Sequence, residues 1–259
     1  HLHPQLQLRL IDFLQEQTTE SVGRTVQVIV TTHSPTLASK AKLASMILVS
    51  KGQAFPMAPK YTQLSPTDYR FLERFLDVTK ANLFFARGVL IVEGDAESLL
   101  LPALARLVGR DLARYGVSIV NVGSRGLRRY ARIFRRRPVA GPPAPASIPI
   151  RVACLADRDV LPDCAREVAA FGTKRTFESD LADNAARENH LQSFRGDDGE
   201  GVRTFVSDRW TLEYDLAYAG LGSLLNKAVA LAKLESRQDR GSAAAARDSF
   251  GAAIRKAKD

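Results

Sequence analysis

Four carboxylates of this 259-residue chain come directly after, or one helical turn beyond, apolar segments typical of β-strands. Glu93 follows GVLIV, and Glu97 lies four residues later, so both can face one site. Asp157 and Asp159 follow VACLA with one residue between them. Like charges held together repel, and packing them without a cation is costly. Oxygen-only groups of this kind suit Mg²⁺ or Mn²⁺, and two such ions can stabilise both the attacking and the leaving oxygen of a phosphodiester.

The elements that must position these acids alternate between strand and helix from residue 88 onward. Such alternation predicts an α/β fold with a central, mostly parallel sheet. Ligands gather beyond the carboxyl ends of the strands in such sheets, so the fold can bring the distant acids together. An alanine-rich, helical tail completes the chain. The predicted strands are 88–94, 117–123, 150–159 and 202–206, and predicted helices begin at Asp95, Arg125, Asp163 and Arg209.

The segment ahead of residue 88 has a different pattern. Apolar residues at helical spacing predict a helix over 4–16, and an unbroken apolar run predicts a buried strand over 26–31. A second strand is expected over 46–50. A single helix is expected over 66–86, because Phe71, Phe75 and Val78 fall on one face and a proline stands at its start.

The composition favours a soluble, cytoplasmic protein with a polyanionic partner. Hydrophobic residues make up 45% of the chain, and the net charge is +9 with a pI near 9.8. No apolar run approaches the ~18 residues that would span a bilayer. The chain begins with HLHPQLQ, without methionine or a secretory leader, so we expect a fragment of a longer protein.

The cysteines and histidines predict no zinc site. Cys154 lies in a strand-like run and Cys164 in a helix-like run, and they form no CxxC pair. Both are expected to be buried thiols in a reducing compartment. The four histidines show no zinc-binding spacing; they are His1, His3, His33 and His190.

The order of the motifs resembles the Toprim domain of topoisomerases, primases, recombination-mediator proteins and a group of nucleases. An apolar strand is followed by E-G-x-x-E, a second strand by VGSRG, and a third by DxD. The family places a glutamate after the first strand and DxD after the third, which here are Glu93, Asp157 and Asp159. The resemblance implies a Rossmann-like Toprim fold and divalent-metal chemistry on nucleic-acid phosphates.

The first residues narrow the resemblance. HLHPQLQ followed by VQVIVTTHSP resembles the end of an ABC-type ATPase domain, with HLHP as its D-loop and His33 as its switch histidine. An ABC-type ATPase followed by Toprim is the layout of the OLD (overcoming lysogenisation defect) family nucleases. The resemblance implies that residues 1–80 are the C-terminal remnant of the ATPase domain. Residues 81–259 would be the Toprim nuclease domain with a helical insertion and tail.

In the OLD family a further acid follows a later strand, in a segment like TLEYDLA. The resemblance carries the metal-ligand role to Glu213, with Asp215 and Asp208 as the alternatives. Two ions would then be divided among Glu93, Glu97, Asp157, Asp159 and Glu213. The family also places a late lysine against the charge that develops on the phosphate. The candidates are Lys227, Lys233, Lys256 and Lys258, and Lys256 is the one taken first.

ATP chemistry is not expected of this chain alone. The sequence contains no GxxxxGK[ST] phosphate-binding loop. Any role of ATP, and of His33 as a switch, therefore belongs to the parent protein. Because ABC-type ATPases pair, the resemblance implies a homodimer through the ATPase part of the full-length protein.

A basic helix is expected over 125–137. It carries seven arginines and no acid, and Leu127, Ala131 and Phe134 can pack inward. We expect its basic face to contact DNA phosphates, which positions DNA without reading its sequence. The alternative is a solvated charged face. The arginines on that face are Arg125, Arg128, Arg129, Arg132 and Arg136.

Together these features predict a Mg²⁺- or Mn²⁺-dependent DNA endonuclease of the Toprim type, with Glu93, Asp157 and Lys256 as catalytic residues. The alternative is a non-catalytic DNA-binding or recombination-mediator module whose acids are structural. A topoisomerase would need a domain with a nucleophilic tyrosine, and a primase zinc or helicase-binding parts, none of which the sequence shows. A regulatory ATPase tail would bind DNA without metal and without cutting it.

Overall fold

The structure is a computed structural model that describes residues 3–18, 27–123, 126–138, 146–167 and 175–236. The chain divides into two compact units. Unit 1 consists of His1–Ala156 and His190–Phe205. Unit 2 consists of Asp157–Asn189 and Val206–Asp259.

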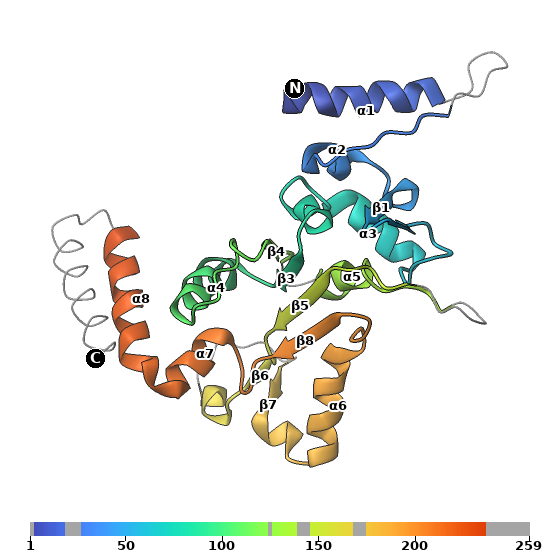
Figure 1. The fold of residues 1–259 in the computed structure, drawn as a ribbon. Coiled ribbons are helices and arrows are strands. Elements are labelled where there is room, and N and C mark those ends of the chain that lie inside the picture. The colour runs from blue at the N-terminus through green and yellow to red at the C-terminus, as the bar shows by residue number, and fades with distance from the viewer. Residues whose placement is uncertain (1–2, 19–26, 124–125, 139–145, 168–174, 237–259) are drawn as a thin grey trace. The chain divides into compact units, whose positions relative to one another are not determined.

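A four-stranded sheet organises unit 1 (Figure 1). Its strands stand in the order β4-β3-β5-β8, and β3 pairs in parallel with both β4 and β5. Gly88 of β3 is in register with Val117 of β4 and with Arg151 of β5. The predicted α/β fold with a central parallel sheet is confirmed. The strands are β3 (Gly88–Val92), β4 (Val117–Asn121), β5 (Arg151–Ala156) and β8 (Val202–Val206).

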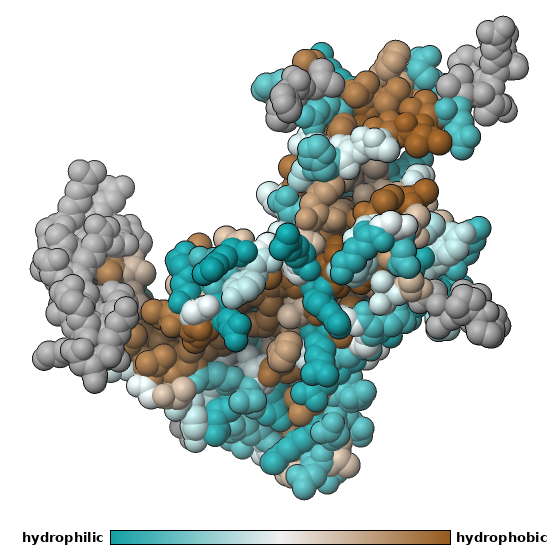
Figure 2. All heavy atoms as spheres, in the orientation of Figure 1, coloured by the Kyte–Doolittle hydropathy of each residue, from teal (hydrophilic) through white to brown (hydrophobic). Residues whose placement is uncertain are grey.

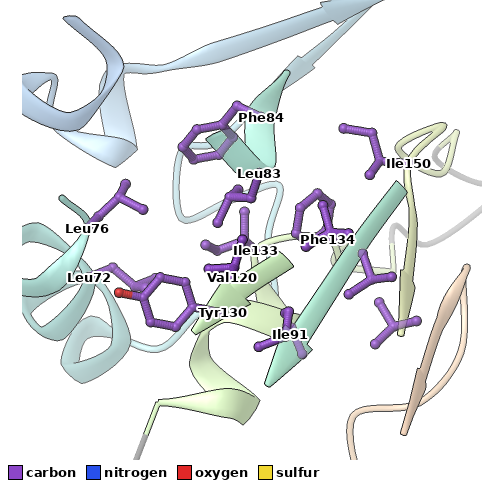
Figure 3. Close-up of a cluster of buried hydrophobic side chains, with 14 of the residues drawn as sticks. Leu72, Leu76, Leu83, Phe84, Ile91, Val120, Tyr130, Ile133, Phe134 and Ile150 are labelled. Atoms are coloured by element: carbon purple, nitrogen blue, oxygen red, sulfur yellow. The ribbon is translucent and has the colours of Figure 1, made fainter. Parts of the chain in front are cut away.

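One hydrophobic core joins the sheet to the helices of unit 1, and Figure 3 shows its central side chains. Tyr130 is fully buried there, and its hydroxyl donates a hydrogen bond to the backbone carbonyl of Phe75 at 2.8 Å. The core contains residues from both sides of position 80, for example Leu72 before it and Val120 after it. The domain boundary between residues 80 and 81 stays a prediction. Core residues come from α3 (Pro66–Phe75), η2 (Lys80–Phe84) and α5 (Leu127–Arg132), and α4 (Asp95–Leu107) follows β3.

The predicted helix over 66–86 is wrong in its length. α3 begins with a capping box between Ser65 and Asp68 and ends at Phe75. The carboxylate of Asp77 then accepts a hydrogen bond from the backbone N–H of Lys80 at 2.9 Å and one from the hydroxyl of Thr79. An aspartate that binds nearby backbone groups favours a turn over a continuing helix, so the chain starts the separate 3₁₀ helix η2.

The predicted strand over 26–31 is also wrong. Residues 27–33 form no strand, and Ile29 is 83% exposed. A β-strand needs a neighbouring strand for its backbone hydrogen bonds, and none pairs with this run within the described part of the chain. Figure 2 shows brown, apolar surface in this region at the top of the view. The neighbouring elements are α1 (Pro4–Thr18), α2 (Pro35–Lys40), η1 (Leu43–Ser45), and the antiparallel pair β1 (Ile47–Ser50) and β2 (Gln53–Pro56).

Short elements make up most of unit 2. The parallel pair β6 (Val160–Leu161) and β7 (Thr176–Phe177) follows the DxD turn, together with η3 (Asp163–Glu167) and η4 (Glu178–Leu181). Its second part contains α7 (Leu212–Leu216), η5 (Ala217–Leu221) and α8 (Gly222–Ser236). α6 (Asn184–Arg195) runs from unit 2 into unit 1. Within the described residues, no helix combines the length and apolar character that a membrane crossing requires.

Only one of the two predicted buried thiols is buried. Cys154 lies inside β5, and burial raises its pKa to about 12. Cys164 is exposed on η3, because the 163–167 segment is a short 3₁₀ turn rather than an amphipathic helix.

We therefore expect a thiol reagent such as DTNB to modify one cysteine per native chain. The thiolate is the reactive form, and a buried thiol with a raised pKa supplies little of it. Cys164→Ser should abolish the native-state reaction, whereas Cys154→Ser should leave it unchanged. Equal labelling of both variants would contradict the burial of Cys154.

Candidate metal centre

Glu93 and Glu97 lie at the carboxyl end of β3. Glu93 is the first residue after the strand and is partly exposed, and α4 begins two residues later with Gly94 as its N-cap. The side chain of Glu97 is buried and folds back over Gly94. A Cβ at position 94 would lie 3.0 Å from Oε2 of Glu97, so glycine leaves the room that this carboxylate needs.

Asp95 and Asn121 join this end of β3 to the end of β4, and the sequence reasoning missed both. The Asn121 amide donates a hydrogen bond to Oδ1 of Asp95 at 2.7 Å. Its own side-chain oxygen accepts from the backbone N–H of Gly123 at 3.0 Å. The first turn of α4 is thereby fixed beside Glu93. The available signal was an amide at the last position of the apolar strand VSIVN.

In unit 2, the carboxylate of Asp157 is held by the segment that leads into α7. Its Oδ1 accepts a hydrogen bond from the backbone N–H of Leu212 at 3.2 Å and one from the Ser207 hydroxyl at 3.5 Å. The backbone N–H of Arg158 donates to the carbonyl of Trp210 at 2.8 Å. The DxD turn and the residue that precedes Glu213 are therefore bonded to each other.

The geometry distinguishes the three acids considered near this segment. Asp215 uses both carboxylate oxygens on backbone N–H groups, accepting from Asp208 at 2.7 Å and from Arg209 at 3.1 Å. The backbone carbonyl of Asp208 accepts from the Arg158 guanidinium. Glu213 is exposed on the first turn of α7. Asp215 therefore has a local structural task, whereas Glu213 and Asp208 are both exposed.

This difference predicts effects of different size for two substitutions. Asp215→Ala should lower the free energy of unfolding by about 1–2 kcal/mol, because two backbone donors lose their acceptor. Glu213→Ala should change it by less than about 0.5 kcal/mol, as for other exposed positions. Urea unfolding of the two variants measures this. A larger loss for Glu213→Ala would contradict the assignment.

Asp159 adopts a left-handed backbone conformation, with φ of 58°. Aspartate tolerates this region better than most residues, and such conformations cluster at functional sites. Directly after it the chain enters β6.

The predicted ligand set falls into both units: Glu93 and Glu97 belong to unit 1, and Asp157, Asp159 and Glu213 to unit 2. Across the described ranges, no three acidic, histidine or cysteine side chains gather closely enough to hold a metal ion. The five-ligand set stays a prediction. Its chemistry fits Mg²⁺ or Mn²⁺, because every donor is a carboxylate oxygen and Gly94 leaves the space that Glu97 occupies.

The arginines of α5 contact acids from distant parts of unit 1. Arg128 and Arg132 donate to the carboxylate of Asp197 at 2.8 and 2.7 Å. Arg129 and Arg132 also lie 3.4 and 3.3 Å from the carboxylate of Asp68. The predicted basic helix is shorter than expected, Leu127–Arg132, and its arginines hold buried carboxylates inside unit 1.

The other predicted residues are placed as follows. Arg136 is buried and donates to the carbonyl of Pro56 at 2.8 Å. His33 is exposed, next to the α2 N-cap Ser34, whose hydroxyl donates to Oε1 of Gln7 at 2.6 Å. Lys227 and Lys233 are exposed on α8. Three predicted residues lie outside the described residues: Arg125, Lys256 and Lys258.

Two parts of the chain match models of known protein families. Residues 84–159 match the TOPRIM domain of proteins described as overcoming lysogenization defect protein-like. Residues 1–39 match an AAA domain described as a putative AbiEii toxin of a type IV toxin–antitoxin system. A search of curated proteins gave no match.

Solved structures similar to the chain include C-terminal regions of OLD proteins. That of Xanthomonas campestris pv. campestris is 24% identical, with a TM-score of 0.35 over 65% of this chain and 72% of that chain. That of Burkholderia pseudomallei is 28% identical, with a TM-score of 0.34 over 54% and 62%. These TM-scores are too low to support an argument from the superposition. The family assignment therefore rests on the matches to the family models. Residues 84–159 are therefore assigned to the OLD-like Toprim domain, and residues 1–39 are similar to part of an AAA domain.

Proposed function

We propose that this chain is the nuclease module of an OLD-like protein and that it hydrolyses phosphodiester bonds of DNA with Mg²⁺ or Mn²⁺. The observation that carries the proposal is the position of its acids along the sheet. β3 and β5 are adjacent and parallel, and each is followed directly by a carboxylate, Glu93 and Asp157. Carboxyl ends of neighbouring parallel strands are where α/β folds place their chemistry.

The roles follow from the contacts of each residue. Bound ions would supply positive charge to the attacking and leaving oxygens of the phosphodiester. The carboxylates proposed to hold them are Glu93, Glu97, Asp157, Asp159 and Glu213. Leu212 and Ser207 orient Asp157 through their hydrogen bonds, and Asn121 fixes Asp95 beside Glu93. Lys256 is the proposed cation against the charge that develops on the phosphate.

DNA is the proposed substrate because of the net charge of +9 and the arginines of α5. Arg128 keeps half of its side chain exposed, and Arg129 more than a third. We propose that these two contact a phosphate while they remain paired with their acids. Arg136 is proposed to support the fold, since its side chain is buried against Pro56.

The test is cleavage of supercoiled plasmid with Mg²⁺, Mn²⁺, Ca²⁺ or EDTA, beside Glu93→Gln. Nicked and linear products should form with Mg²⁺ or Mn²⁺, disappear in EDTA, and be absent for the variant. Circular dichroism of Glu93→Gln would confirm that it is folded. Intact plasmid with every ion, together with retained DNA binding, would favour the non-catalytic module instead.

A further inference from the structure

Three aromatic side chains form a row in unit 2 that begins just before α7 and ends in η5, which we call the aromatic row: Trp210, Tyr214 and Tyr218. They stand four residues apart, and Tyr214 and Tyr218 lie about one helical turn from each other. The ring centroids of Trp210 and Tyr214 are 5.7 Å apart. Those of Tyr214 and Tyr218 are 6.4 Å apart, with ring planes only 27° from parallel.

The far end of the aromatic row is open to solvent and carries a cation. Tyr218 is 62% exposed. The guanidinium of Arg209 lies 3.4 Å from the centroid of its ring. Proteins bind unpaired nucleic-acid bases on accessible aromatic rings, and arginine contributes cation–π contacts to such surfaces. A ring that served only the core would not leave most of its surface in water.

The backbone at Tyr218 is specialised as well. Gly220 has φ of 97°, which interrupts the helical backbone within Ala217–Leu221 and makes a kink before α8. The kink separates the direction of α8 from that of α7, so the aromatic row ends at Tyr218.

The aromatic row begins at the proposed metal ligands. The carbonyl of Trp210 accepts from the backbone N–H of Arg158, the middle residue of the DxD turn, at 2.8 Å. The backbone N–H of Leu212 donates to Asp157, and Glu213 immediately precedes Tyr214 in the first turn of α7. A nucleotide stacked on the row would therefore be near the carboxylates that we propose act on the phosphodiester.

We infer that the aromatic row is a stacking surface for unpaired bases, and that the substrate is DNA with a single-stranded segment. Bases of an intact duplex are already stacked on their neighbours, so they cannot also stack on protein rings without unpairing. The location of this surface beside a cutting site rests on the proposed function. The stacking itself requires no cleavage, which allows it to be tested separately.

Trp210 is the only tryptophan of the chain, so its fluorescence reports on the aromatic row alone. Titration of the full chain with oligo(dT) in EDTA, where no cutting is expected, should quench this emission. Tyr218→Ala should weaken oligo(dT) binding about tenfold, while Tyr218→Phe keeps an aromatic face and should retain it. The matched control is Tyr115→Ala in unit 1, where the tyrosine is 49% exposed, and it should bind as the wild type does.

A duplex of the same length separates the inference from general charge attraction. Tyr218→Ala should bind this duplex as tightly as the wild type. Unchanged oligo(dT) affinity in Tyr218→Ala, or equal losses for oligo(dT) and duplex, would overturn the inference. A chain that stacks oligo(dT) through Tyr218 but cuts no DNA with Mg²⁺ or Mn²⁺ would refute the nuclease proposal and leave the stacking surface standing.

Discussion

Replacing Asp157 with asparagine is expected to lower the rate of plasmid cleavage by about 1000-fold or more, because a metal-held transition state is worth several kcal/mol. The substitution removes the negative charge and little else. Asparagine keeps a side-chain oxygen that can accept the hydrogen bond from the backbone N–H of Leu212, now 3.2 Å from Asp157 Oδ1. The measurement is the rate at which supercoiled plasmid disappears with Mn²⁺ in excess.

The matched control for this prediction is Glu188→Gln, which removes an exposed acid from α6 in the same unit. It should cut at the wild-type rate. Thermal unfolding of the two variants should give midpoints close to that of the wild type. Cleavage by Asp157→Asn at the wild-type rate would remove this carboxylate from the proposed mechanism.

Asp68→Ala is expected to lower the free energy of unfolding by about 2–4 kcal/mol. This is somewhat less than the loss for a fully buried ion pair, because the arginines that pair with Asp68 are partly exposed. Asp68 is 3% exposed and accepts hydrogen bonds from the backbone and hydroxyl of Ser65 at 2.9 and 2.8 Å. Its loss removes the carboxylate half of the α3 capping box and leaves Arg129 without its acid. Urea unfolding followed by circular dichroism measures the effect.

The same carboxylate should make stability depend on pH. Burial of Asp68 acts to raise its pKa, but the hydrogen bonds from Ser65 and the charge of Arg132 outweigh it and bring the pKa below the ordinary 3.8. A lowered pKa stabilises the fold above the ordinary value, and this contribution is lost as the pH falls through the folded-state pKa. The difference between the wild type and Asp68→Asn should therefore shrink in acid.

The exposed ion pair of Asp12 with Lys40, 3.8 Å apart, provides the control. Asp12→Ala should cost less than about 0.5 kcal/mol, since exposed pairs contribute little. A stability loss for Asp12→Ala as large as that for Asp68→Ala would show that burial and capping do not set the effect.

Sequence reasoning worked best for the parallel sheet. The strands that begin at Gly88, Val117 and Arg151 are short apolar runs in the sequence. Such runs are typical of parallel sheets, because both faces of the sheet are covered and both sets of side chains are apolar. The same rule failed for residues 26–31, which are equally apolar. Apolar character indicates that a segment is suited to a sheet, whereas a strand also needs a partner, and sequence order does not supply that partner.

The contacts of α5 were beyond the reach of local patterns for a related reason. The stretch 125–137 contains no acid, so its arginines were expected to face solvent or DNA. Their partners come from 61 to 69 positions away in the chain, and they are Asp68 and Asp197. Only the fold brings such groups together, and it also distinguishes Asp215, which binds two backbone N–H groups, from Glu213, which is exposed.

The pairing of the α5 arginines with acids lowers the net positive charge that this helix can present to DNA. Arg128, Arg129 and Arg132 face the carboxylates of Asp68 and Asp197, so three cations share two anions and one positive charge remains uncompensated. Binding of DNA to this helix would therefore release about one condensed counterion, whereas binding to three unpaired arginines would release about three. The dependence of DNA affinity on ionic strength should accordingly be shallow for this surface, because the two acids neutralise two of its three positive charges.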